Sequence, residues 1–139
     1  MRLTRYTDYA LRVLLYLGAR QNELCAISEI AKAYDISKNH LMKVVNDLAR
    51  AGYVTSVRGR FGGIRLARPA AEIRLGEVVR HTEEGFALAD CEHCVIAPAC
   101  GLTSALSRAL AAFMAVLDDY TLADLVRNKT KLAALLQLG

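Results

Sequence analysis

The feature that most constrains the fold is a pair of candidate helices separated by a short turn, between residues 29 and 51. The first helix, 29–34, ends before a turn at 35–37, and the second covers 38–51, with Ser37 placed to cap it. Apolar side chains recur along the second helix at helical spacing and give it one face to bury. This order predicts a helix-turn-helix, whose second helix enters the major groove of DNA.

Two β-prone segments follow the second helix, at 53–57 and 64–67, and a glycine-rich basic loop separates them. The glycines of this loop permit the tight turn of a hairpin. Arg58 and Arg60 stand near its tip, where they suit phosphates or a narrow minor groove. A hairpin directly after a helix-turn-helix is the winged-helix plan. The expected fold is therefore mainly α: a winged helix-turn-helix DNA-binding domain plus a long dimerisation helix.

Charge is unevenly distributed along the chain. Residues 1–70 hold 12 Lys and Arg against 5 Asp and Glu, whereas residues 71–139 hold 6 against 9. A basic half favours a polyanion partner, with a solvated basic surface as the alternative. Combined with the winged-helix pattern, it indicates double-stranded DNA. The candidate DNA-binding residues are Ser37, Lys38, Asn39, His40, Lys43, Arg58, Arg60, Gly62 and Gly63.

A long apolar helix is expected from residue 103 to residue 119 or 120. It is apolar on most sides, so it needs burial on most sides. A second copy of the chain is the simplest cover, and an ordinary core helix is the alternative. Spacings of three and four, typical of a helix pair, relate Leu102, Leu106, Ala109, Phe113, Val116 and Tyr120. Further helices are expected at 7–20, 75–83 and 122–128, and the chain after 128 is not assigned.

Cysteine usage indicates a metal or redox site. Cys91, Cys94 and Cys100 fall within ten residues, whereas Cys25 stands alone before an apolar segment and is expected to be buried. Thiolates are soft ligands that suit zinc, copper(I) and iron–sulfur clusters. Three explanations are open: zinc held by the three cysteines and His93, an iron–sulfur cluster with a fourth ligand from elsewhere, or redox switches without a metal. This chemistry favours zinc and a cluster about equally.

Several classes of protein are excluded by composition and pattern. No stretch approaches the roughly 20 apolar residues of a membrane span, the longest run being 109–117. Asp8 and Arg12 interrupt any signal-peptide core. We therefore expect a cytoplasmic protein, in a reducing compartment where clustered cysteines favour ligation or redox chemistry over disulfides. We do not expect an enzyme, because none of the three histidines stands in a recognisable catalytic pattern.

Segments along nearly the whole chain match one known pattern. They are residues 7–12, 36–41 and 51–54, the wing Arg58-Gly59-Arg60-Phe61-Gly62-Gly63-Ile64-Arg65-Leu66, the loop Cys94-Val95-Ile96-Ala97-Pro98-Ala99-Cys100, and residues 120–125. Winged helices are common, but this wing followed by this cysteine loop is specific. The chain resembles the winged-helix family of iron–sulfur transcriptional regulators, and within it the nitric-oxide sensors.

The resemblance implies a homodimeric repressor of genes for nitric oxide detoxification. It implies an iron–sulfur cluster, 4Fe–4S rather than 2Fe–2S, with zinc less favoured. The implied ligands are Cys91, Cys94, Cys100 and Asp8 of the partner subunit. Only two residues separate Cys91 from Cys94, fewer than is usual in the family, so Glu92 and His93 are further candidate ligands.

The resemblance also implies the domain organisation of the chain. Residues 1–84 form the winged helix-turn-helix domain, 85–102 the cluster-binding loop, and 103–139 the dimerisation helix and C-terminal helix. If nitric oxide displaces the weak oxygen ligand Asp8, the tie between dimer core and DNA-binding half is lost, at a coupling energy of roughly 1–3 kcal/mol. The alternatives are a related sensor of iron–sulfur or iron status, a zinc-dependent regulator, and a small iron–sulfur electron carrier, which would not need a recognition helix.

Overall fold

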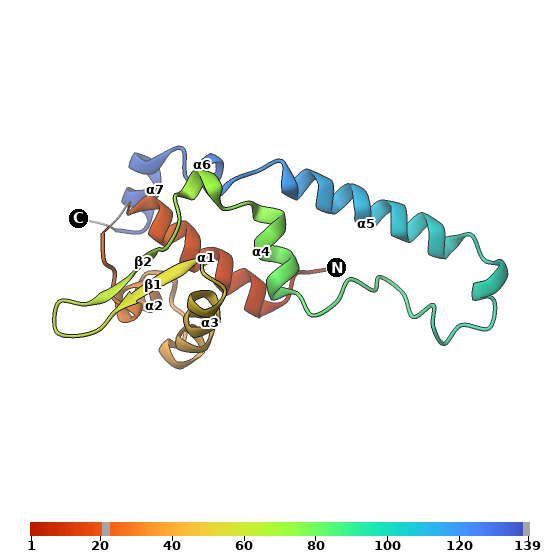
Figure 1. Ribbon diagram of the computed structural model, residues 1–139, viewed down its shortest axis with the longest axis horizontal. Helices are drawn as coiled ribbons and strands as arrows, with labels where there is room; N and C mark the ends of the chain where they lie inside the picture. The colour runs from red at the N-terminus through yellow and green to blue at the C-terminus, as the bar shows by residue number, and fades with distance from the viewer. Residues whose placement is uncertain (21–22, 138–139) are drawn as a thin grey trace.

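The computed structural model describes residues 1–20 and 23–137, so the last two residues of the expected segment 103–139 lie outside the described residues. The architecture is mainly helical with one small hairpin, as predicted (Figure 1). Its elements are α1 (Arg5–Ala19), α2 (Ile27–Tyr34), α3 (Lys38–Arg50), β1 (Val54–Val57), β2 (Gly63–Leu66), α4 (Leu75–Thr82), α5 (Leu102–Asp118), α6 (Leu122–Leu125) and α7 (Lys129–Leu135), with short 3₁₀ turns at Ala70–Glu72 and Ala97–Ala99.

Helix α1 lies at the centre of the fold, packed against α3, α4, α6, α7 and β2. It begins at Arg5, two residues earlier than predicted, because the Thr4 hydroxyl accepts a hydrogen bond from the backbone N–H of Thr7 at 3.3 Å. This is a side-chain N-cap, and it extends the helix by part of a turn. The core around α1 is formed by side chains from every element of the DNA-binding half, among them Val13, Leu14, Leu17, Ile30, Leu41, Val44, Leu48, Ile64 and Val78.

The helix-turn-helix consists of α2 and α3, which pack on each other. Asp35 ends α2 in the left-handed conformation, with φ 56°, and the chain enters α3 three residues later. Ser37 caps α3 as predicted, because its hydroxyl accepts from the backbone N–H of His40 at 3.4 Å. The turn therefore fixes the direction of α3 relative to α2.

Helix α2 starts at Ile27, two residues before its predicted start. The side chain of Glu29 accepts from the backbone N–H of Ala26 at 2.8 Å, which satisfies a donor at the helix entrance. The same carboxylate accepts from the hydroxyl of Tyr16 on α1 at 2.7 Å. One acidic side chain thus both starts α2 and fastens it to the central helix.

Strands β1 and β2 form an antiparallel hairpin in register from Val54 opposite Leu66 to Val57 opposite Gly63. The hairpin is fastened to the body at Cys25, whose backbone N–H donates to the carbonyl of Ile64 at 2.9 Å and whose carbonyl accepts in return at 2.8 Å. The wing is therefore held at its base.

Helix α5 extends away from the body, and the loop that precedes it forms the far end of the molecule, opposite the wing (Figure 1). Its carboxyl-terminal end is tied to α4 by Arg80, which pairs with both oxygens of Asp118 at 2.5 and 2.8 Å. Gly76 on α4 lies against this pair. None of the described helices combines the length and apolar composition that a membrane crossing requires.

The chain after α5 returns to the central helix, where α6 packs against α1. Gly18 permits this approach, because a Cβ there would lie 3.3 Å from Val126. The predicted helix 122–128 was too long, since α6 ends at Leu125. A separate helix, α7, follows with Asn128 as its cap, and its formation was not expected.

Candidate DNA interface and cysteine loop

The amino end of α3 presents polar side chains to solvent. Ser37, Lys38, Asn39 and Lys43 are exposed, while His40 is half-buried. The opposite face of the same helix is in the core, because its apolar side chains recur every three or four residues. The N-cap Ser37 and the four candidate residues of α3 therefore lie on the part of the helix that faces away from the core, which is the arrangement that reaching into a groove requires.

His40 is the member of this set that also contacts the body of the protein. Its imidazole meets the ring of Tyr9 on α1 edge to face, with ring centroids 4.8 Å apart and planes at 63°. Further along α3, Asp47 is 3.0 Å from Nε2 of His81 on α4. Both ends of the outward face are thus positioned by neighbouring helices, and Tyr9 is a residue that the sequence pattern did not single out.

The wing brings Arg58 and Arg60 to an exposed loop, as expected. Gly62 and Gly63, also candidates for DNA contact, have a clear role in the fold. A Cβ on Gly62 would overlap the carbonyl oxygen of Val57, and Gly63 has φ 153° with the backbone of Cys25 at 2.8 Å from where its Cβ would be. These two glycines close the base of the loop, because no larger residue fits there.

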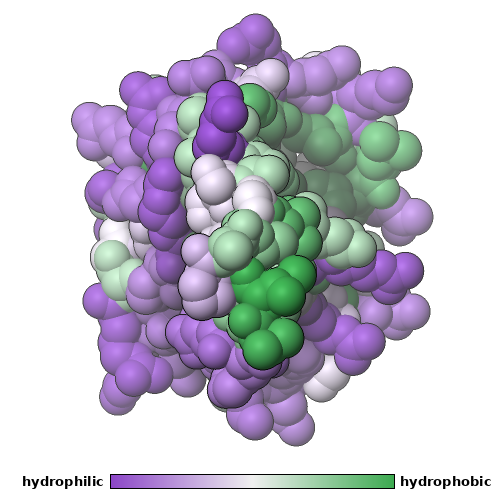
Figure 2. Space-filling model, turned by 90° about the vertical axis from the view of Figure 1, so that its right-hand side faces the viewer, coloured by the Kyte–Doolittle hydropathy of each residue, from purple (hydrophilic) through white to green (hydrophobic). Residues whose placement is uncertain are grey.

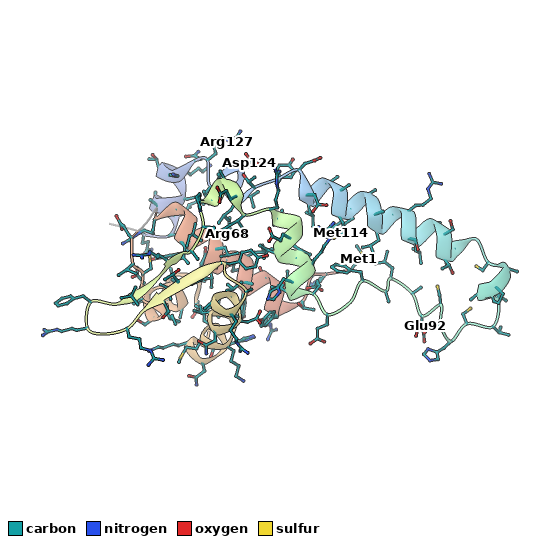
Figure 3. All side chains as sticks on the ribbon, in the orientation of Figure 1. Met1, Arg68, Glu92, Met114, Asp124 and Arg127 are labelled. Carbon is teal, nitrogen blue, oxygen red and sulfur yellow. The ribbon has the colours of Figure 1, made fainter. Side chains whose placement is uncertain are left out.

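The cysteine loop occupies residues 83–101, between α4 and α5. Cys91 and Cys94 are joined by a turn in which the backbone N–H of Cys94 donates to the carbonyl of Cys91 at 3.3 Å. Cys94 is exposed, and Cys91 and Cys100 are partly exposed. At the start of α5, the backbone N–H of Leu102 donates to Sγ of Cys100 at 3.4 Å. All three thiols therefore lie on one accessible loop, whose outer position is marked by Glu92 in Figure 3.

Within the described ranges, no three His, Cys, Asp or Glu side chains are gathered closely enough to hold a metal ion. Asp8 pairs instead with Arg12 on its own helix, at 3.0 Å. His93 pairs with Asp90, its Nδ1 lying 2.7 Å from the carboxylate. The donor chemistry still fits an iron–sulfur cluster, because three thiols stand on one loop and an N–H already donates to one of their sulfurs. A single chain leaves this set one ligand short.

Cys25 is of a different kind, as expected. It is fully buried beside β2, and burial, together with the nearby charge of Glu29, raises the pKa of its thiol to about 11. A thiol in this state is inert, because the thiolate is the form that reacts or binds metals.

The start of the cysteine loop is fastened to the amino end of α1 by Glu83. Its carboxylate accepts from the backbone N–H of Thr4 at 3.1 Å, from the Thr4 hydroxyl at 2.7 Å, and from the hydroxyl of Thr7. Burial acts to raise the pKa of this carboxyl, but the hydrogen bonds from the two threonines outweigh it, so the pKa is lowered. This contact places the loop's first residue beside the turn that carries Asp8.

Helix α5 leaves most of its apolar surface uncovered. Met114 is the one buried residue of this helix, all of which is described, whereas Leu102 is 53% and Val116 56% exposed. The loop-side end of the molecule shows a central strip of apolar side chains between polar ones (Figure 2). A cavity of about 630 Å³ lies between the amino terminus, α4 and α5, and its lining includes Leu11, Val79 and Phe113. These surfaces fit the predicted seam for a second helix.

Comparison with known proteins decides the family. The model of the Rrf2 family, described as an iron-dependent transcriptional regulator, matches residues 3–128. The chain belongs to the Rrf2 family. As a member of this family it is a transcriptional regulator with a winged DNA-binding domain, which confirms the expected fold and the expected resemblance.

Several relatives in the Rrf2 family are similar over nearly their full length. The HTH-type transcriptional regulator NsrR of Bacillus subtilis is 53% identical, with 99% of each chain covered. The regulator of the same name from Bacillus licheniformis is 50% identical, over 98% of this chain and 99% of that one. Both relatives are named as transcriptional regulators, which is consistent with the expectation that the protein is not an enzyme.

Solved structures of Rrf2-type regulators share the fold. The structure of CymR, the global cysteine regulator of B. subtilis, has a TM-score of 0.78 at 26% identity, covering 91% of this chain and 97% of that one. The structure of T. potens IscR has a TM-score of 0.77 at 26% identity, covering 92% and 88%.

Proposed function

We propose that the protein is a homodimeric transcriptional repressor that senses nitric oxide through an iron–sulfur cluster. The cluster-bearing dimer binds operator DNA, and nitric oxide releases it. The observation that carries the proposal is the position of the cysteine loop. It joins a winged DNA-binding half to an apolar helix that a single chain leaves exposed, in a chain about half identical to regulators named NsrR.

The proposed DNA contacts come from two elements. Lys38, Asn39 and His40, with Ser37 and Lys43, face a major groove from the amino end of α3, where side chains reach base edges and phosphates. Arg58 and Arg60 face the backbone or the minor groove from the wing. Gly62 and Gly63 contribute by closing the wing so that its backbone can approach the duplex.

The proposed cluster ligands are the thiolates of Cys91, Cys94 and Cys100, with Asp8 of the partner subunit as the fourth. When bound, a 4Fe–4S cluster supplies iron atoms to which nitric oxide binds. The backbone N–H of Leu102 supports this ligand set, because it donates a hydrogen bond to Sγ of Cys100 and so helps to hold this side chain in place. An aspartate completes the set weakly, since carboxylate oxygen is a hard ligand among soft thiolates.

Contacts of the chain itself can carry a change at the loop to the DNA-binding surface. Glu83 holds the start of the loop against Thr4, the N-cap of α1, and against Thr7 in the first turn of that helix. Asp8 and Tyr9 lie in the same stretch, and Tyr9 packs on His40 of α3. Displacement of Asp8 of the partner subunit would therefore disturb the first turn of α1 in that same subunit. This turn positions one residue of that subunit's own DNA-binding surface.

An anaerobic preparation tests the whole proposal. We expect a brown protein with broad sulfur-to-iron absorption. In a gel-shift assay it should bind a duplex selected from a random library and release that duplex after nitric oxide is added. A colourless protein with one zinc per chain, or equal DNA affinity with and without cluster, would contradict it.

The ligand role of Asp8 has its own test. Asp8→Ala should alter the cluster spectrum and the response to nitric oxide. The matched control is Asp119→Ala, an exposed aspartate beyond the end of α5. If Asp8→Ala gave the same spectrum and the same nitric oxide response as Asp119→Ala, Asp8 would not be a cluster ligand and its role would be the ion pair with Arg12.

A second candidate is a sensor of iron or of iron–sulfur supply. It is favoured by the description of the family as iron-dependent and by the structural likeness to T. potens IscR. The two candidates separate in a reporter assay. Release of repression by iron limitation without nitric oxide would favour the supply sensor.

A further inference from the structure

The tip of the wing presents one large apolar side chain among basic residues. Phe61 is 87% exposed, on the loop between β1 and β2. Its neighbours Arg58, Arg60 and Arg65 are also exposed. A phenylalanine ring in this position gains nothing from burial on folding, so the structure of the chain itself does not account for it.

The local backbone places Phe61 at a corner of a tight turn in the loop. The backbone N–H of Gly62 donates to the carbonyl of Gly59 at 3.0 Å, which closes a tight turn. Arg60 and Phe61 are the two corner residues of that turn, and both are exposed. Below the turn, Gly62 packs against the carbonyl of Val57, leaving no room for a side chain. The Phe61 ring therefore extends from a hydrogen-bonded turn that is closed at both ends.

The surroundings of the ring indicate what it contacts. The guanidinium of Arg60 lies 5.7 Å from the centroid of the Phe61 ring. A flat apolar surface beside guanidinium groups fits the minor groove of duplex DNA, where arginine meets the negative potential and apolar side chains pack against sugars and base edges. Duplex DNA is favoured over a protein partner because this loop is the wing that follows the helix-turn-helix in a family of transcriptional regulators.

We infer that Phe61 packs into the minor groove of the operator beside Arg60 and discriminates against a guanine at that place. The minor groove of a G·C pair carries the 2-amino group of guanine, whereas an A·T pair presents no group there that projects into the groove. A ring packed against the groove floor is excluded by that amino group. The inference rests on the proposed DNA binding and adds a determinant of sequence preference to it.

The affinity test uses the full-length, cluster-bearing dimer and a duplex selected by the wild-type protein from a random library. Phe61→Ala should weaken binding roughly tenfold in fluorescence anisotropy, since the apolar contact is lost. The dependence of log affinity on log salt should stay unchanged, because no charge is removed. Arg60→Ala should instead make the slope of log affinity against log salt shallower, by the amount expected for the loss of about one phosphate contact. Phe61→Leu should restore most of the affinity, and Leu135→Ala, a truncation of another well-exposed apolar residue on α7, should change nothing.

The groove assignment is tested by modified bases. Replacing single adenines with 2,6-diaminopurine adds an amino group in the minor groove and leaves the major-groove face of the base pair in place. Substitution at one or two neighbouring positions in each half-site should weaken binding of the wild-type protein. The same substitutions should not change the affinity of Phe61→Ala.

The outcomes distinguish this inference from the proposed function. If the wild-type protein enriches no duplex, both are overturned. If it binds, but Phe61→Ala has wild-type affinity or the same sensitivity to diaminopurine, the assignment of Phe61 is wrong and the DNA-binding proposal stands.

Discussion

The ring of Tyr9 on α1 packs edge to face on the imidazole of His40 on α3, with centroids 4.8 Å apart. Tyr9 follows Asp8 in the chain, and His40 lies on the outward face of α3. The residue proposed to complete the metal site and a residue proposed to contact DNA are thus separated by one side-chain contact. A change at Asp8 therefore has a short path, through Tyr9, to the DNA-binding face of α3.

Tyr9→Ala should weaken DNA binding without removing a DNA contact. Edge-to-face pairs contribute about 0.5–1.5 kcal/mol, so the loss of His40 positioning should cost roughly two- to tenfold in affinity. Fluorescence anisotropy on the selected duplex measures it. Tyr9→Phe keeps the ring and is the control. Equal affinities of the alanine and phenylalanine variants would show that this contact does not position His40.

The hydrogen bonds of Glu83 should make stability depend on acid pH. The pKa of Glu83 is lowered in the folded protein, so its contribution is present above its ordinary value of about 4.5 and is lost as pH falls through the lowered value. Glu83→Gln should reduce the free energy of unfolding at pH 7 by about 1 kcal/mol, a figure discounted because the side chain is partly exposed.

Urea unfolding at pH 7 and at pH values below 4 measures this effect. The difference between wild type and Glu83→Gln should shrink in acid. Glu84→Gln, which alters an exposed neighbour, should match wild type at both pH values. A difference that persists undiminished in strong acid would refute the role of the Glu83 carboxylate.

The four cysteines should divide into two classes in alkylation. Cys25 is fully buried and its thiol has a pKa of about 11, whereas the thiols of the loop are accessible. In cluster-free protein, iodoacetamide at pH 8 should label the loop cysteines, and Cys25 only after unfolding. Mass spectrometry of tryptic peptides reads the result. Rapid labelling of Cys25 in the native protein would contradict its structural assignment.

Gly76→Ala should loosen the junction between α4 and α5. The added Cβ would overlap Oδ1 of Asp118, which is paired with Arg80, so the ion pair must move. Because both partners are partly exposed and the overlapped atom is the end of a flexible side chain, we expect a small loss of stability, which calorimetry would record as a slightly lower melting temperature. In the double variant with Asp118→Ala the overlap is relieved, so its destabilisation should be smaller than the sum of the two single effects. Strict additivity would mean that the two residues do not meet.

Local pattern was sufficient for the helix-turn-helix, the wing and the burial of Cys25. Side-chain periodicity, cap residues and glycines act over a few neighbours, so the cap by Ser37 and the hairpin after α3 follow from the chain alone. The cysteine spacing likewise placed three thiols on one loop. Together with the wing, it led to the family resemblance that the comparison confirmed.

Other features were decided by contacts between residues far apart in sequence. The fastening of the cysteine loop by Glu83 to Thr4 joins residues 79 positions apart, and no local period encodes such a pair. Helix α7 and the true end of α6 depend on packing against α1, which compensates for weak local preference. The exposure of α5 and of Phe61 was also settled only in three dimensions, because burial depends on what the rest of the chain covers. Sequence thus determined most of the elements and their chemistry. Tertiary structure determined α7, the end of α6, and which surfaces remain exposed to meet a partner.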